Sequence, residues 1–289
     1  YHIFEEYAYY LVSEARQKCA NHIFKLGGNV YAFDSTTIDL CLSVFWWAKF
    51  RKNKGGIKVH TLYDVETQIP AFFHITEASV HDSKVMIEIP YEPSSYYIFD
   101  RGYNNFKMLY KIHQIEAYFV VRAKKNLGYK SIQWKRRLPK NVLSDASVLL
   151  TGFYPKQYYP EPLRLVKYWD EEQEREFIFI TNAMHISALQ VAELYKNRWQ
   201  VELFFKWLKQ HLKIKRFWGT TENAVRIQIY AAICAYCLVA IIQHDMQLDR
   251  STYEVLQILS ISLTDKTHLR DLFNKTKFQN DKERFGPNG

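Results

Sequence analysis

Cysteine is scarce in this sequence, with four residues among 289, at positions 19, 41, 234 and 237. Secreted scaffolds held together by disulfides need a far denser set of cysteines, so the composition excludes that class. Cys234 and Cys237 have the spacing of a metal or redox pair, but no second Cys or His pair lies near them in the sequence. Because both fall within an apolar helical stretch, we expect their thiols to pack in the core.

Long hydrophobic runs are missing as well. The longest uncharged apolar run, residues 229–242, has 14 residues and is too short to span a bilayer. No secretory signal, repeat or low-complexity segment is evident. We therefore expect a buried helix at this run, no membrane partner and a cytoplasmic protein. Since the chain begins with Tyr1 rather than Met, a missing amino-terminal region stays an open alternative.

Positive charge and aromatic side chains are abundant. The chain carries 39 Lys and Arg against 30 Asp and Glu, which gives a net charge of +9 and a pI near 9.1. This excess favours a polyanionic partner such as nucleic acid. Aromatic residues make up 16% of the chain, a composition typical of a globular protein. Its length is enough for one large domain or two smaller ones.

Hydrophobic periodicity predicts a mixed α/β core. The expected strands cover residues 29–41, 57–64, 69–77, 96–100 and 117–123, and the expected helices cover 2–20, 104–113, 187–212 and 222–244, with another beginning near 81–82. The order strands, helix, strand, helix, strand is that of a ribonuclease H-like fold, a mixed sheet flanked by helices. We divide the chain into a helical lead-in (1–24), a first core part (25–123), an insertion (124–176), a second core part (177–245) and a helical, polar tail (246–289).

The insertion, residues 124–176, is predicted to be rich in β-structure, because short apolar pieces alternate with prolines there. Six cations lie at its start and are expected to face DNA, with a solvated loop as the alternative: Lys124, Lys125, Lys130, Lys135, Arg136 and Arg137. Trp134 and Trp169 are expected to pack within the insertion. A role in stacking on a flipped base is the alternative.

Three acidic residues occupy positions where a carboxylate is unexpected. Asp34 lies in the middle of an apolar strand, and Asp100 ends another strand just before Gly102. Glu202 lies in a predicted helix, where Tyr195, Arg198 and Lys209 share its face within an arc of roughly 60°. Buried carboxylates are costly unless they are paired or bind a metal ion. The three could converge on a divalent cation, although an ordinary solvated helix face would also explain the helical stripe.

At these motifs the chain resembles the DDE transposases of bacterial insertion sequences, in the family with the signature Y-(2)-R-(3)-E-(6)-K. The signature is complete as Tyr195, Arg198, Glu202 and Lys209. The strand motifs match as Asp34-Ser-Thr-Thr and Asp100-Arg-Gly-Tyr103. The resemblance covers about residues 25 to 245 and implies the same ribonuclease H-like fold, with a β-rich insertion before the last catalytic helix.

The resemblance also implies a function. Asp34, Asp100 and Glu202 would bind two Mg²⁺ (or Mn²⁺) ions, with Asp34 as the bridging ligand, for cut-and-paste cleavage and strand transfer. Tyr195, Arg198 and Lys209 would contact transposon-end DNA, unless Arg198 and Lys209 simply pair with acids and Tyr195 packs in the core. The expected partners are double-stranded DNA, at transposon ends and target, and a second copy of the chain in a homodimer. The expected location is the bacterial cytoplasm, at the nucleoid when DNA is bound.

Two rival functions stay open. A ribonuclease H-like nuclease of another class would share the carboxylates but need not carry the Tyr-Arg-Glu-Lys helix. A decayed or domesticated transposase remnant would bind DNA without cutting it. The intact acidic triad speaks against the second rival, but a missing amino-terminal DNA-binding region would leave the chain inactive by itself.

Overall fold

The computed structural model describes residues 1–20, 24–41, 43–51, 54–211, 217–250, 252–262 and 266–275. Its strands are β1 (Val30–Leu40), β2 (Lys49–Arg51), β3 (Lys54–Asp64), β4 (Ile69–Glu77), β5 (Tyr96–Phe99), β6 (Tyr118–Arg122), β7 (Tyr129–Trp134), β8 (Val142–Leu150), β9 (Leu163–Asp170) and β10 (Arg175–Thr181). The α-helices are α1 (His2–Lys18), α2 (Phe106–Gln114), α3 (Phe153–Tyr158), α4 (Ala188–Lys196), α5 (Trp199–His211), α6 (Glu222–Asp245), α7 (Thr252–Ser262) and α8 (Leu269–Lys275). Short 3₁₀ helices are η1 (Trp46–Ala48), η2 (Asp82–Glu88) and η3 (Arg101–Tyr103).

The five core strands have the order predicted from the sequence. Strand β1 is central, β3 pairs with it in antiparallel fashion, and β4 pairs with β3. On the other side of β1, β5 and then β6 are added in parallel. In chain order the core strands thus lie third, second, first, fourth and fifth across the sheet, which is the ribonuclease H-like arrangement.

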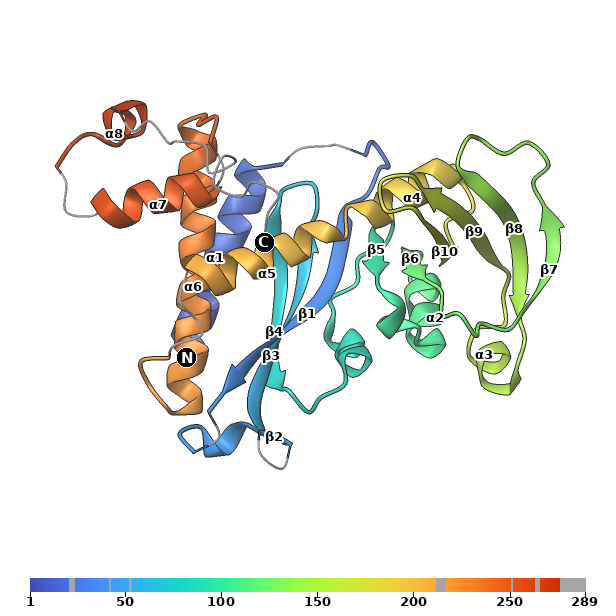
Figure 1. Cartoon of the computed structure of the whole chain (residues 1–289), viewed down its shortest axis with the longest axis horizontal. Helices are drawn as coiled ribbons and strands as arrows, with labels where there is room; N and C mark the ends of the chain where they lie inside the picture. The colour runs from blue at the N-terminus through green and yellow to red at the C-terminus, as the bar shows by residue number, and fades with distance from the viewer. Residues whose placement is uncertain are drawn as a thin grey trace, which may run out of the picture.

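The predicted β-rich insertion is present, but its strands continue the core sheet. Strand β10 pairs with both β6 and β9, so β9, β8 and β7 extend one ten-stranded sheet to the right-hand edge of Figure 1. The packing expected for the two insertion tryptophans is wrong for Trp134, which is 62% exposed, and Trp169 is also exposed, at 39%. Trp134 ends β7 at the edge of the sheet, and Trp169 lies near the end of β9, two strands further in.

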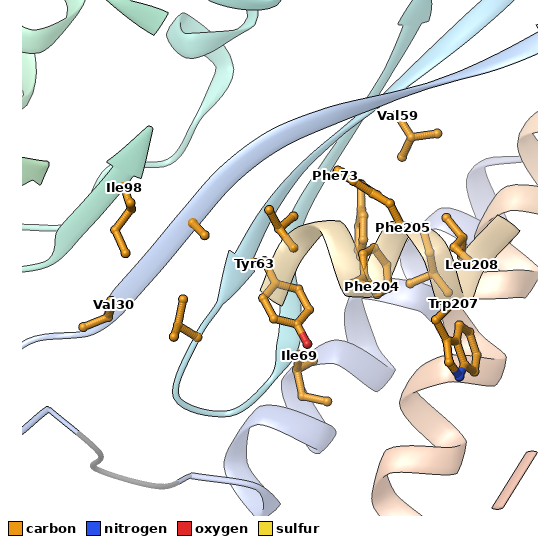
Figure 2. Close-up of a cluster of buried hydrophobic side chains, with 14 of the residues drawn as sticks. Val30, Val59, Tyr63, Ile69, Phe73, Ile98, Phe204, Phe205, Trp207 and Leu208 are labelled. Atoms are coloured by element: carbon orange, nitrogen blue, oxygen red, sulfur yellow. The ribbon is translucent and has the colours of Figure 1, made fainter. Parts of the chain in front are cut away.

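The two faces of the sheet bury different helices. Successive side chains of a strand point to opposite faces. Val30 and Ala32 therefore join a cluster with α1, α5 and α6, whereas Tyr31 and Phe33 join a cluster with α2. In Figure 2, Phe204 and Phe205 of α5 reach toward Tyr63 and Phe73 of the sheet.

Helix α6 is, by length and apolar composition alone, long enough to cross a membrane, although half of its most apolar window is buried in the protein. It packs along α1 (Figure 1), and its Cys234 and Cys237 are buried, as expected for core residues. Because the central helix of a soluble core has the same properties, this helix is weak support for a membrane span.

The single helix predicted over residues 187–212 is wrong, because the chain forms two helices, α4 and α5, joined at Asn197 and Arg198. At the joint the Arg198 N–H donates to the Tyr195 carbonyl at 3.0 Å, and the Val201 N–H donates to the Arg198 carbonyl at 3.2 Å. The Asn197 side chain also donates to the Glu193 carbonyl at 2.9 Å, which competes with regular helical bonding. The signature residues therefore lie on two helices and the turn between them.

A buried ion pair ties the insertion to the start of α4. Arg164 of β9 is 2% exposed, and its guanidinium donates twice to the carboxylate of Asp145 on β8, at 2.7 and 2.8 Å. The same guanidinium donates to the carbonyls of Ala183 and Ile186, at 3.3 and 2.5 Å. These carbonyls lie four residues and one residue before Ser187, which caps α4. The insertion therefore fixes the point at which the α4–α5 pair begins.

We expect Asp145→Ala to lower the free energy of unfolding by about 3 kcal/mol, because it leaves the buried Arg164 charge without its partner. Urea unfolding followed by circular dichroism measures this loss. Glu171→Ala is the matched control, since Glu171 pairs with Lys140 at 3.1 Å but both side chains are exposed. Equal, small effects of the two substitutions would show that the buried pair does not stabilise the fold.

Candidate active site

Two of the predicted carboxylates lie side by side, Asp34 within β1 and Asp100 just after β5. Phe33 of β1 and Phe99 of β5 are paired in parallel register, and Asp34 and Asp100 follow them directly. The turn that begins after Asp100 forms η3, so the second carboxylate lies at the carboxyl end of its strand. The side chains of Asp34 and Asp100 are 23% and 35% exposed, which leaves both accessible from one side.

The guanidinium of Arg198 joins the first carboxylate to the third. Its Nη1 donates to Asp34 Oδ2 at 2.8 Å, and its Nη2 donates to Glu202 Oε1 at 2.5 Å. Arg198 can reach both because it lies in the turn between α4 and α5, while Glu202 lies one turn into α5. The arginine side chain is 15% exposed, so this contact is largely shielded from water.

Tyr195 connects the second carboxylate to the same cluster. Its hydroxyl donates to Asp100 Oδ1 at 2.8 Å, and the Arg198 guanidinium lies 5.7 Å from the centre of its ring. The ring packs against Phe177 and Phe179 and the residue is 8% exposed. The ring of Tyr195 therefore packs in the core, which was one of the two alternatives predicted. Its hydroxyl orients Asp100.

The pKa values of the two aspartates move in opposite directions. Burial raises the pKa of Asp34 to about 6; the nearby charges of Glu202 and Asp100 add to this rise, and Arg198 and the Ser35 N–H oppose it. Burial also acts on Asp100, but its hydrogen bonds from Tyr195 and the Arg101 N–H, with the charges of Arg198 and Arg122, bring its pKa below the ordinary value. The carboxylates are therefore close enough to repel one another.

The donor set fits a hard divalent cation, because it consists of carboxylate oxygens whose mutual repulsion a cation would relieve. In the part of the chain that the structure describes, however, no three Asp, Glu, His or Cys side chains lie close enough together to hold a metal ion. The carboxylates of Asp34 and Glu202 point at the Arg198 guanidinium instead. Lys209, half-buried, lies two turns beyond Glu202 on α5, about 10 Å along the helix axis.

Sequence reasoning missed a polar brace on the other face of β1. The Ser35 hydroxyl donates to Asp82 Oδ1 at 2.8 Å, and Lys58 Nζ lies 3.0 Å from the same oxygen. The helix expected to begin near residues 81–82 is the 3₁₀ helix η2, which Asp82 begins and His81 caps. Ser35 directly follows Asp34, and its N–H donates to Asp34 Oδ1 at 2.8 Å, so the brace helps to orient that carboxylate.

A pocket of about 890 Å³ adjoins the carboxylate cluster. It lies between the β9–β10 hairpin and the α4–α5 pair, and Arg122, Tyr195, Arg198 and Glu202 form part of its wall. Arg122 lies over the ring of Phe177, 4.9 Å from its centre, and 3.9 Å from Asp100. The only signal for Arg122 in the sequence was its place at the end of a core strand.

The other candidates lie away from this cluster or serve the fold. Asp39 is exposed on β1, five residues beyond Asp34, and Asp64 ends β3 with Arg16 as its partner at 2.9 Å. The six cations of the insertion are all exposed: Lys124, Lys125, Lys130, Lys135, Arg136 and Arg137. Lys135 is partly committed, because its Nζ lies 3.3 Å from the carboxylate of Asp145.

His60 on β3 makes the brace sensitive to acid. It is fully buried, and burial lowers its pKa to about 4, with Lys58 and His74 adding to the decrease and Asp82 opposing it. The folded protein therefore keeps His60 neutral down to about pH 4, whereas the unfolded chain takes up a proton below about pH 6.5. Stability should fall as the pH decreases through this window, by about 3 kcal/mol at most.

We expect His60→Gln to remove this part of the acid sensitivity between pH 6.5 and 4, measured by urea unfolding at several pH values. His2→Gln is the control, because His2 is exposed on α1. An unchanged pH dependence in His60→Gln would show that the buried imidazole is protonated in the folded protein.

Comparison with known proteins was made against families, curated sequences and solved structures. The family model described as "Transposase DDE domain" matches residues 25–238. The chain is 36% identical over 246 residues to the putative transposase y4zB of Sinorhizobium fredii, covering 83% of this chain and 67% of that one. It is 31% identical over 205 residues to the probable transposase for insertion sequence element IS5377 of Geobacillus stearothermophilus, covering 71% of this chain and 54% of that one.

The chain thus spans about half to two thirds of the length of these relatives. A solved structure of piggyBac transposase in a synaptic complex with hairpin DNA is similar at 12% identity and a TM-score of 0.48, covering 88% of this chain and 55% of that one. The family match covers most of the present sequence and contains all three carboxylates and Arg198. This chain therefore belongs to the family of transposases with a DDE domain.

Proposed function

We propose that this chain catalyses metal-dependent cleavage and strand transfer at the ends of an insertion sequence, by cut-and-paste transposition. The observation that supports this most is the gathering of Asp34, Asp100 and Glu202, from two parallel strands and a crossing helix, around one pair of residues, Tyr195 and Arg198. Double-stranded DNA, at the ends and at the target, is the proposed substrate, and a homodimer in the bacterial cytoplasm is the proposed assembly.

Asp34, Asp100 and Glu202 are the residues that would hold two Mg²⁺ (or Mn²⁺) ions. When bound, such ions activate the attacking oxygen and stabilise the leaving oxygen of a phosphodiester. The protein supplies oxygen donors from rigid elements, and it orients them through Tyr195 on Asp100 and through Ser35 and Asp82 next to Asp34. Rigid support of this kind is what a metal-binding carboxylate needs to keep its geometry.

Cations on the open side of the cluster are suited to bind the DNA backbone. Arg198 and Lys209 are the proposed phosphate contacts, because both lie on the helix pair that carries Glu202. The exposed cations of the insertion, residues 124–137, would follow the backbone further from the cut. For Tyr195, whose hydroxyl is bonded to Asp100, the proposed DNA contact is secondary to orienting that carboxylate.

The rival functions predict different outcomes. A remnant that only binds DNA has no need for the Tyr195 to Asp100 bond or for the brace at Ser35, and both are intact. A nuclease of another class would cut DNA but would not join a 3′ end to a target. Joining of a labelled DNA end to a plasmid separates that rival from a transposase.

We expect Asp34→Asn, Asp100→Asn and Glu202→Gln each to reduce nicking of supercoiled plasmid DNA in Mn²⁺ to background, because each removes a charged oxygen donor without changing the size of the side chain. DNA binding, measured by fluorescence anisotropy, should persist. Asp39→Asn is the matched control on the same strand and should nick normally. Nicking by Asp34→Asn at the wild-type rate would refute the assignment of the carboxylates.

We expect Lys209→Ala to weaken DNA binding and to reduce the slope of log affinity against log salt concentration by about one, the amount for one lost phosphate contact. Lys18→Ala, on α1 at an exposed pair with Asp245, is the control. An unchanged slope together with a lower unfolding temperature would assign Lys209 to folding instead of DNA binding.

A further inference from the structure

Arg198 occupies the oxygens that a metal ion would need. Its Nη1 bonds Asp34 Oδ2 and its Nη2 bonds Glu202 Oε1, so two of the three carboxylates share one guanidinium. A divalent cation binding to the same oxygens would lie next to a fixed positive charge and would have to displace at least one of these bonds. In the DNA-free protein the guanidinium and the metal ion are therefore competitors.

The burial of the cluster makes this competition strong. Asp34 is partly buried and close to the negative charges of Glu202 and Asp100, so a nearby cation stabilises its charged form. Arg198 supplies that cation, with 15% of its side chain exposed. Charges interact more strongly away from water, and the repulsion between a metal ion and a guanidinium in this place is larger than on the surface.

Arg198 has an alternative position close at hand. It forms part of the wall of the pocket of about 890 Å³, so open space borders its side chain. Its Nε is buried and has no hydrogen-bond partner among the residues that the structure describes, so the present position does not satisfy all of its donors. A phosphate oxygen in the pocket would accept from the guanidinium, and arginine is well suited to this contact.

The pocket wall carries charges of both signs and includes two further acids, Asp170 and Glu193. The acids Glu171 and Glu172 of the β9–β10 turn are paired with Lys140 at 3.1 Å and Lys196 at 2.8 Å. Arg122, at the wall of the same pocket, adds a second guanidinium near Asp100. The pocket can therefore receive a phosphate group at its inner end, between the two arginines.

We propose that Arg198 is an internal counter-cation that keeps the metal site closed until a DNA phosphate draws its guanidinium away. Metal binding then depends on DNA, and the protein loads DNA first and metal second. This inference rests on the proposed function, because it takes the carboxylates as metal ligands. By linkage, DNA should raise metal affinity and metal should raise DNA affinity by the same factor.

The test measures Mn²⁺ binding by electron paramagnetic resonance, on the full chain, with and without random-sequence duplex DNA at low salt. For the wild type we expect weak Mn²⁺ binding that tightens about tenfold when DNA is added. Arg198→Ala should bind Mn²⁺ about tenfold more tightly than the wild type without DNA, and should respond little to DNA. Arg198→Lys should lie between the two, because one ammonium cannot bridge two carboxylates as a guanidinium does.

Arg226→Ala is the matched control, because Arg226 also pairs with an acid one turn away, Glu222 at 2.8 Å, but on α6. It should bind Mn²⁺ like the wild type. Thermal unfolding monitored by circular dichroism checks that each variant is folded, and Arg198→Lys carries the test if Arg198→Ala is not. Unchanged or weaker Mn²⁺ binding by the folded Arg198 variants without DNA, or equal binding by the wild type with and without DNA, would overturn the inference.

Failure of the proposed function gives a different result. If Asp34→Asn leaves Mn²⁺ binding unchanged, or if no variant binds Mn²⁺ even with DNA, the carboxylates are not the metal site and the inference falls with it. If Asp34→Asn abolishes Mn²⁺ binding but Arg198→Ala does not tighten it, the metal site stands and only the role of Arg198 is refuted.

Discussion

The rest of the site depends on the repulsion among three carboxylates that the fold forces together. Asp34 and Asp100 directly follow residues of β1 and β5 that are paired in parallel register, so they cannot separate without breaking the sheet. Glu202 arrives on a helix whose apolar face is held against the same sheet by Phe204 and Leu208. The sheet and the hydrophobic core thus hold like charges close together, and the bonds of Arg198 and Tyr195 make that arrangement tolerable.

The sequence predicted those features of the fold that a short stretch of residues determines. A carboxylate inside or at the end of an apolar strand is rare, so Asp34 and Asp100 could be chosen as candidate site residues from their immediate neighbours. The core strands also followed from alternation and from glycine and proline at their ends. The break at Asn197 was not predictable, because the apolar spacing continues across it and the Asn197 side chain bonds to the Glu193 carbonyl only in the folded chain.

Contacts between segments that are far apart in the sequence could not be predicted, because no local pattern signals them. The bond from Ser35 to Asp82 joins residues 47 apart, and each alone has an ordinary explanation as a strand or cap residue. The position of the insertion's strands could not be predicted either, because only the pairing of β10 with β6 shows that these strands extend the core sheet. Composition predicted that the insertion is rich in β-structure, but composition carries no information on which edge it joins.

The insertion is connected to the carboxylate cluster by hydrogen bonds as well as by charge. Arg164 holds the carbonyls that precede α4, and α4 carries Tyr195, which in turn orients Asp100. A movement of the outer strands would therefore be transmitted to the start of α4 and to the turn at Arg198. Most of the exposed cations lie in the loops on either side of β7, so DNA bound there would act on the strands that hold the start of α4. A continuous sheet thus gives one route by which such DNA would influence the guanidinium between Asp34 and Glu202.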